Sequence, residues 1–305
     1  MPITSAGFQI AQVAQAVRGA QAAAPATGIP VVHALVLGVV QGLTEFFPVS
    51  SSGHLIIVPW LFHWNDVTRD TDLNKTFDVA LHLGTFIGAA AYFAPDLARF
   101  AKAGVSSIRR RQVRTTDERL AWLLLLSAIP GAAAGALLEN FIEDKLGQEW
   151  LIALMLIAFG LVLAAADRLP GKRESDEFGV RDAATMGVLQ ALALSPGVSR
   201  SGVTITGARW LGFERDGAAR LSFLMSLPII GGAALYKGVK VFAGNGLPAG
   251  TGGAFLAGMV ASAVTGGFAV WGTLRYVRKR SFTPFVVYRV LAGAFVLALI
   301  ATGVR

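Results

Sequence analysis

A carboxyl group, an imidazole and three adjacent hydroxyls occur close together near residue 50. Gln41 and Glu45 are four residues apart, so both side chains project from one face of a helix. The run Ser50–His54 follows them directly. A charge in an apolar segment costs roughly 3 kcal/mol unless it is partnered. We therefore interpret Glu45 as a general base or, with Gln41 nearby, as a ligand of a hard metal ion. The alternative is a carboxylate that only hydrogen-bonds to the serines.

The serine run could bind an anion and supply a nucleophile. Ser50, Ser52 and Gly53 offer hydroxyls and free backbone N–H groups at a helix N-terminus, which suits phosphate. Ser51 is the candidate nucleophile or the holder of an attacking water, and His54, three residues later, would move its proton. The structural alternatives are a helix cap for the serines and a packing hydrogen bond for His54.

A second polar cluster lies in the other half of the chain, from Pro196 to Thr204. Arg200 stands there in an apolar segment and needs an anionic partner, and its planar fork matches phosphate well. The competing partner is Glu45, which would form a buried ion pair with it. Further candidate donors to a phosphate are Gly197, Ser199, Ser201 and Thr204.

The two clusters are copies of one segment. Residues 38–56 align without gaps with residues 187–205, at an offset of 149, and nine of nineteen positions are identical. Their polar side chains differ, because Ser51 aligns with Arg200 and His54 with Val203. This pattern is typical of two half-sites that build one asymmetric site. Ser51, the serine that diverged, is therefore the better candidate for a role needed once.

Composition indicates a polytopic, all-α membrane protein. Of 305 residues, 54% are hydrophobic and only 15% are charged, and the mean hydropathy is +0.57. A soluble domain carries about 25% charged residues. The net charge of +8 comes from short loops between apolar runs, so it indicates topology and not a nucleic-acid partner. The absence of cysteine excludes disulfides and thiolate metal sites.

Six apolar runs are long enough to cross a bilayer: roughly 77–95, 119–138, 149–167, 217–237, 252–272 and 284–304. The two polar clusters lie outside these runs. Each sits at a Pro/Ser/Gly break between two short apolar stretches, 31–47 with 54–64 and 183–195 with 201–212, which predicts two re-entrant helical hairpins. Asp78 and His82 share a face of the first span, and this spacing alone assigns them no role.

The charges of the loops predict the topology. The loops 96–119, 168–182 and 273–283 hold seven, four and four Lys or Arg residues, so they are expected in the cytoplasm and both termini outside. One membrane domain would then consist of repeat 1 (31–167) and an inverted repeat 2 (183–304), a plan in which broken helices meet near the midplane. Residues 1–30 are expected to form an interfacial helix or to be disordered.

The motifs resemble a known family. Gln41–Glu45 with Phe47–His54, and Pro196–Thr204, are similar to the paired motifs of the undecaprenyl-diphosphate phosphatase family, which is associated with bacitracin resistance. The resemblance covers roughly residues 31–304. It implies hydrolysis of undecaprenyl diphosphate to undecaprenyl phosphate and phosphate in the bacterial plasma membrane, which recycles the lipid carrier for peptidoglycan and cell-wall synthesis. The residues it carries over are Glu45, Ser51, His54, Ser199, Arg200 and Thr204.

The resemblance also bears on cofactors and partners. The family allows Glu or Gln at the first motif position; Gln41 here leaves Glu45 as the principal acid. A polyprenyl diphosphate and membrane lipids are the expected partners, and a Mg²⁺ or Ca²⁺ ion and a homodimer are compatible with the resemblance. The rival function is an inverted-repeat transporter or lipid flippase. A transporter needs only an anion clamp, whereas this chain also offers a nucleophile and an acid/base group.

Overall fold

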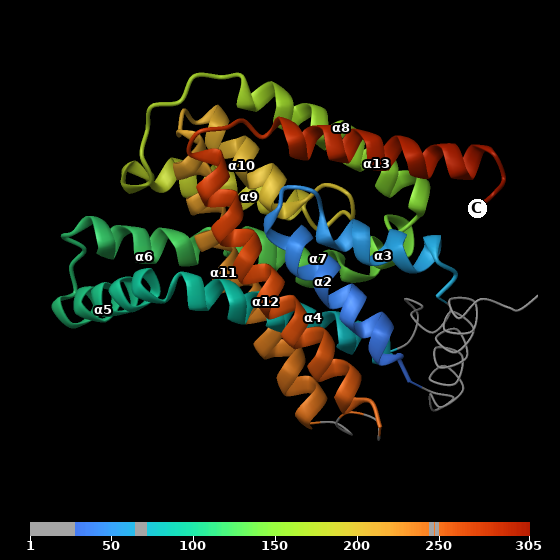
Figure 1. Cartoon of the computed structure of the whole chain (residues 1–305). Coiled ribbons are helices and arrows are strands. Elements are labelled where there is room, and N and C mark those ends of the chain that lie inside the picture. The colour runs from blue at the N-terminus through green and yellow to red at the C-terminus, as the bar shows by residue number, and fades with distance from the viewer. Residues whose placement is uncertain (1–27, 65–71, 244–246, 248–249) are drawn as a thin grey trace, which may run out of the picture.

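The computed structural model describes residues 28–64, 72–243, 247 and 250–305 (Figure 1). The interfacial or disordered segment predicted for residues 1–30 lies almost wholly outside this range. Regular structure in the described part is helical, apart from one isolated β-bridge between Arg173 and Phe213. The elements are α2 (Val31–Phe46), α3 (Ser51–Leu61), α4 (Asp72–Tyr92), α5 (Ala94–Arg110), α6 (Thr116–Leu126), α7 (Ile129–Lys145), α8 (Glu149–Asp167), η1 (Ser175–Glu177), α9 (Val180–Leu192), α10 (Arg200–Trp210), α11 (Arg215–Ala243), α12 (Gly252–Val277) and α13 (Thr283–Ala301).

The all-α membrane fold predicted from composition is confirmed. Within the described ranges, five helical stretches are long and apolar enough to cross a membrane: 116–138, 149–167, 215–236, 252–277 and 283–301. A sixth is gained if the bent pair α4 and α5 counts as one span. Each predicted span therefore corresponds to a helix or to a helix pair, as α6 and α7 form one stretch interrupted at Ser127–Ala128.

The prediction of a loop at 96–119 is wrong for most of its length. The chain turns by 83° after Tyr92 and continues as α5, which begins with Pro95 in its first turn and ends at Arg110. Proline is favoured at this position, because its missing N–H has no partner in the first turn of a helix. Arg109 and Arg110 in the last turn complement the negative end of the helix dipole. A basic, amphipathic helix therefore occupies the predicted cytoplasmic loop.

The two predicted hairpins have the same local structure. α3 and α10 each contain 11 residues and begin at Ser51 and Arg200, which are 149 positions apart. The residues before them, Ser50 and Ser199, have φ angles of 78° and 74°. Such positive φ values are rare for residues other than glycine and mark strained turns that surrounding contacts must hold. The duplicated sequence thus encodes a duplicated turn, while the inverted orientation of the second copy in a bilayer stays a prediction.

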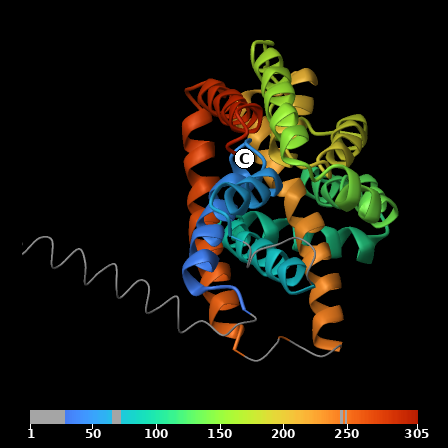
Figure 2. The same ribbon diagram turned by 90° about the vertical axis from the view of Figure 1, so that its right-hand side faces the viewer.

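Helix α12 packs along both α2, which carries Gln41 and Glu45 of the first polar cluster, and α4. Gly38 of α2 lies against Gly258 and Ala261, and a Cβ there would come within 2.9 Å of the Ala261 side chain. Such small residues let helix backbones approach closely in membranes. In Figure 2, α2 and α4 lie between α12 on one side and α11 on the other. α8 and α13 pack together at the end of the molecule where the hairpin breaks lie (Figure 1).

Candidate active site

The two hairpin breaks lie in direct contact, as the internal repeat predicted. The backbone N–H of Gly197 donates to Ser50 Oγ at 3.0 Å, and the hydroxyl of Ser201 donates to the carbonyl of Phe47 at 3.2 Å. In both bonds the second break donates and the first break accepts. Gly53 allows the approach, because a Cβ there would lie 3.2 Å from the Gly197 nitrogen and 3.0 Å from the Ile152 side chain.

Arg289 of α13 donates hydrogen bonds to the backbone of both breaks, and the sequence motifs did not predict it. Its side chain is fully buried and donates to carbonyl oxygens of the first break (Pro48, 3.0 Å) and of the second (Gly197, 2.9 Å; Val198, 3.0 Å). Its Nε donates to Leu156 of α8 at 3.0 Å. An arginine inside an apolar run was the available signal, because intramembrane charges must find partners. One side chain thus holds the backbone of both turns in place.

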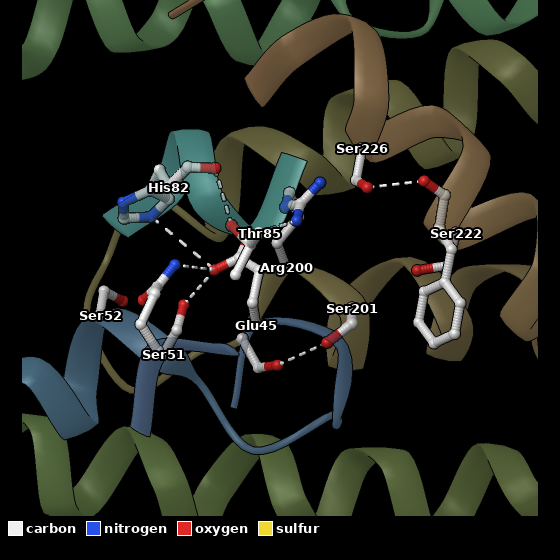
Figure 3. A network of polar contacts seen from close by, with 12 residues as sticks. Glu45, Ser51, Ser52, His82, Thr85, Arg200, Ser201, Ser222 and Ser226 are labelled. Atoms are coloured by element: carbon white, nitrogen blue, oxygen red, sulfur yellow. Dashed lines mark hydrogen bonds and ion pairs between the residues drawn. The ribbon is translucent and has the colours of Figure 1, made fainter. Parts of the chain in front are cut away.

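Glu45 is the centre of the polar network drawn in Figure 3. The hydroxyl of Ser51 donates to its Oε2 at 2.5 Å, and Gln41 Nε2 donates to the same atom at 3.0 Å. Arg200 Nη2 lies 2.5 Å from Oε1, and His82 Nε2 lies 3.7 Å from Oε2. Glu45 is buried, with 6% of its surface exposed. A buried carboxylate needs such partners, since a charge without them is costly in a low-dielectric interior.

Arg200 forms an ion pair with Glu45, which was the structural alternative to phosphate binding. Arg200 also remains available to a ligand. It lines the central cavity, and 15% of its side chain is exposed. Its Nη1 has no hydrogen-bond partner among the described residues. A guanidinium carries five N–H donors, so binding Glu45 through Nη2 leaves capacity for a second anion. The two roles are compatible in this geometry.

The cavity between the hairpins has a volume of about 360 Å³. Its polar wall comes from the two breaks, and among the predicted residues Glu45, Ser50, Ser51, Ser52, Ser199 and Arg200 line it. Helix α4 adds Lys75, Asp78 and His82, and α9 adds Gln190. Helix α11 supplies an apolar wall of Ile229, Ile230, Ala233 and Ala234. The site can therefore take an anionic group and an attached hydrocarbon together.

The other predicted site residues lie around this cavity without lining it. Gly53 and Gly197 provide close packing, and Ser201 bonds to the first break. The hydroxyl of Thr204 bonds to the Arg200 carbonyl at 2.8 Å and to Ser222 of α11 at 2.6 Å. Ser199, which does line the cavity, also caps its own helix by accepting from the Gly202 N–H at 3.1 Å. These residues shape the second turn and orient Arg200.

The structure separates His54 from Ser51 and Glu45. Its Nδ1 lies 2.7 Å from the Ser50 carbonyl, its Nε2 lies 2.7 Å from the hydroxyl of Tyr288, and its ring stacks on Tyr288. His54 is buried and does not line the cavity. Ser51 and His54 are three residues apart on α3, as expected. The hydroxyl of Ser51 nevertheless bonds to Glu45, and the ring of His54 bonds to Tyr288. His82 lies beside Glu45 instead.

The residues present do not build a metal site by themselves. In the described part of the chain, no three His, Cys, Asp or Glu side chains converge as ligands. Both oxygens of Glu45 already accept from Ser51, Gln41 and Arg200. Mg²⁺ is commonly held by one or two carboxylates together with substrate phosphates and waters, so the substrate would have to complete such a site. The divalent cation predicted from the sequence stays a prediction.

Fold and site define an integral membrane protein of helices whose two broken hairpins enclose a cavity for an anionic lipid-like ligand. The chain belongs to the family of the bacitracin resistance protein BacA, whose model matches residues 34–295. It is 48% identical over 274 residues to an undecaprenyl-diphosphatase of Pelobacter propionicus, covering 89% of this chain and 98% of that protein. An undecaprenyl-diphosphatase of Geobacter sulfurreducens is 48% identical over 270 residues, covering 88% and 97%. The family resemblance inferred from the motifs is confirmed.

Proposed function

We propose that this protein hydrolyses undecaprenyl diphosphate to undecaprenyl phosphate and inorganic phosphate, and so recycles the lipid carrier for cell-wall synthesis. The curated relatives bear the name undecaprenyl-diphosphatase and match over nearly their whole length. The observation that carries the proposal is the position of Glu45, which accepts from the Ser51 hydroxyl and pairs with Arg200 at the same cavity. A base, a nucleophile and an anion clamp are thereby assembled in one place.

In the proposed reaction, Ser51 Oγ attacks the terminal phosphorus while Glu45 Oε2 receives the serine proton. The bond from phosphorus to the bridging oxygen breaks, and the leaving undecaprenyl phosphate keeps the electron pair. Water then hydrolyses the phosphoserine and releases phosphate. Arg200 binds the transferring phosphoryl group, with Ser52 and Ser199 as further donors, since phosphoryl transfer depends mainly on positioning and electrostatic stabilisation.

The apolar wall of the cavity supports a lipid substrate. Ile229, Ile230, Ala233 and Ala234 of α11 stand opposite the polar break residues in the same cavity. A substrate with its diphosphate at Arg200 would extend its first isoprene units along α11 and the rest into the bilayer. Apolar pockets with a few converging polar groups are typical ligand sites. Burial of the chain's beginning would position the phosphorus near Ser51.

We place the protein in the bacterial plasma membrane with both termini outside, because its most basic loops are expected in the cytoplasm. The basic helix α5 belongs to that cytoplasmic set. Homodimer formation stays a prediction from the family resemblance.

Phosphate release from undecaprenyl diphosphate by the purified protein in detergent tests the proposal, with and without EDTA to test the cation. Glu45→Gln keeps the size of the side chain and removes the base, so it should lose nearly all activity. Wild-type protein that releases no phosphate under either condition, yet moves the labelled lipid across vesicle membranes, would favour the transporter or flippase.

A further inference from the structure

His82 of α4 joins the active site although its helix belongs to neither polar motif. Its ring lines the cavity, 35% of its side chain is exposed, and Nε2 lies 3.7 Å from Glu45 Oε2. The same carboxylate oxygen accepts the Ser51 hydroxyl. Ser51, Glu45 and His82 therefore meet at one carboxylate oxygen (Figure 3). All three residues line the cavity.

The hydrogen bond on the other side of the ring fixes which nitrogen is basic. His82 Nδ1 lies 2.8 Å from the carbonyl oxygen of Asp78. A carbonyl oxygen only accepts, so Nδ1 carries a proton in either charge state, and the neutral ring keeps its lone pair on Nε2. Nε2 faces Glu45. It can therefore gain or lose a proton without breaking the bond that orients the ring.

His54 lacks this freedom. Both of its ring nitrogens have partners, the Ser50 carbonyl at 2.7 Å and the Tyr288 hydroxyl at 2.7 Å. The carbonyl requires N–H at Nδ1, so Nε2 accepts from Tyr288 in the neutral ring. A proton arriving at Nε2 would reverse that bond, with the Tyr288 hydroxyl as acceptor, and would place a charge in a buried position away from the cavity. His54 therefore holds the turn at Ser50, whereas His82 Nε2 is placed to accept a proton from Glu45.

We propose that His82 is the second base of the reaction and accepts at Nε2 the proton that Glu45 takes from Ser51. The Ser51 oxygen forms its bond to phosphorus, and the bridging oxygen leaves with its electron pair. The proton passes from Ser51 Oγ to Glu45 Oε2. It then passes to His82 Nε2 when the 3.7 Å between these two atoms closes to hydrogen-bond distance, and the ring later releases it to water in the cavity. This role rests on the proposed phosphatase activity.

The charged groups around His82 explain why the proton moves on from Glu45 to His82. A proton left on Glu45 would abolish the carboxylate that pairs with Arg200 at 2.5 Å. Its transfer to His82 restores this pair and leaves an imidazolium next to a carboxylate. The charged groups that share the cavity with His82 are Glu45 of α2, Arg200 of α10, and Lys75 and Asp78 of α4. Of the described residues, α11 contributes only apolar ones there, and α12 none.

Phosphate release measured between about pH 5 and pH 9 tests the relay. His82→Gln keeps a polar side chain next to Glu45 but cannot take up the proton. We expect its kcat to fall by roughly 100-fold, as is usual for loss of a general base, with KM within about threefold of the wild-type value. The decline of kcat on the acidic side, caused by protonation of His82 before the reaction, should disappear in this variant.

Two matched variants separate this role from a structural one. His63→Asn changes an exposed histidine that does not line the cavity. The backbone φ at this residue is 55°, which asparagine tolerates. The pH profile of this variant should equal that of the wild type. His54→Gln should keep the acidic decline. The inference is overturned if His82→Gln keeps wild-type kcat and its acidic decline, or if His54→Gln removes that decline. Wild-type protein without phosphate release would instead overturn the proposed function itself.

Discussion

Replacing Arg289 by methionine tests whether one buried side chain holds the two hairpin breaks in place. Methionine fills a similar volume but donates no hydrogen bond. The change leaves three carbonyl oxygens of the breaks without this donor, those of Pro48, Gly197 and Val198, now bonded at 2.9–3.0 Å. It also removes the bonds to Leu156 (3.0 Å) and Met155 (3.4 Å), whose carbonyls lie inside α8 and keep their helical partners. The buried charge that is removed has only these carbonyl oxygens as partners among the described residues. The turns at Ser50 and Ser199, both at positive φ, would lose the contacts that stabilise them.

The expected loss of stability follows from these bonds. Each buried acceptor left unsatisfied costs about 1–3 kcal/mol. We take the lower value, because methionine also relieves the cost of burying the guanidinium, and obtain a loss of roughly 3 kcal/mol for the three carbonyls of the breaks. That is a large part of a total stability of about 5–15 kcal/mol. With a shift of about 2–4 °C per kcal/mol for a large domain, the unfolding midpoint should fall by roughly 6–12 °C.

Thermal unfolding of the purified protein in detergent, followed by circular dichroism, measures this shift. The matched control is Arg278→Met, since Arg278 is 60% exposed and makes only a surface pair with Asp216 at 3.4 Å. Exposed pairs contribute about 0–1 kcal/mol, so this midpoint should change by less than about 4 °C. Equal midpoints for both variants, within about 3 °C of the wild type, would refute the reasoning about Arg289.

Three further outcomes are expected. Ser51→Ala should abolish phosphate release while substrate binding is kept; substantial turnover in this variant would favour an attacking water. Arg200→Lys keeps the charge but loses the planar fork, so kcat should fall by roughly 100-fold in folded protein, and near-normal turnover would contradict phosphate binding by Arg200. Loss of folded Arg200→Lys protein that is rescued by Glu45→Gln would show a mainly structural ion pair. A single cysteine at the exposed Gln148 should react with a membrane-impermeant thiol reagent from outside the cell; reaction only from the cytoplasmic side would reverse the predicted topology.

Composition, apolar run length and the internal repeat were sufficient to predict the membrane class, most of the helices and the two breaks. Long apolar runs satisfy their backbone hydrogen bonds only as helices in lipid, so composition and run length were sufficient. The repeat at an offset of 149 residues located both turns, and it paired them correctly because a duplicated segment keeps its backbone geometry. Glu45, Ser51 and Arg200 followed from their types and positions. Sequence reasoning failed at α5, where a basic amphipathic segment resembles a loop when only the apolar runs are counted.

The polar groups that surround Glu45 depend on contacts between distant helices, which the sequence pattern does not show. Spacing along α3 favoured His54, but the rotation of that helix carries the ring to Tyr288. His82 reaches Glu45 because α2 and α4 both pack closely on the small residues of α12, a contact that no local pattern contains. Arg289 reaches Pro48 across 241 residues because α13 packs on α8, another contact between distant segments. Periodicity fixes which side chains share a face of one helix, whereas the depth and rotation of neighbouring helices depend on packing between distant segments.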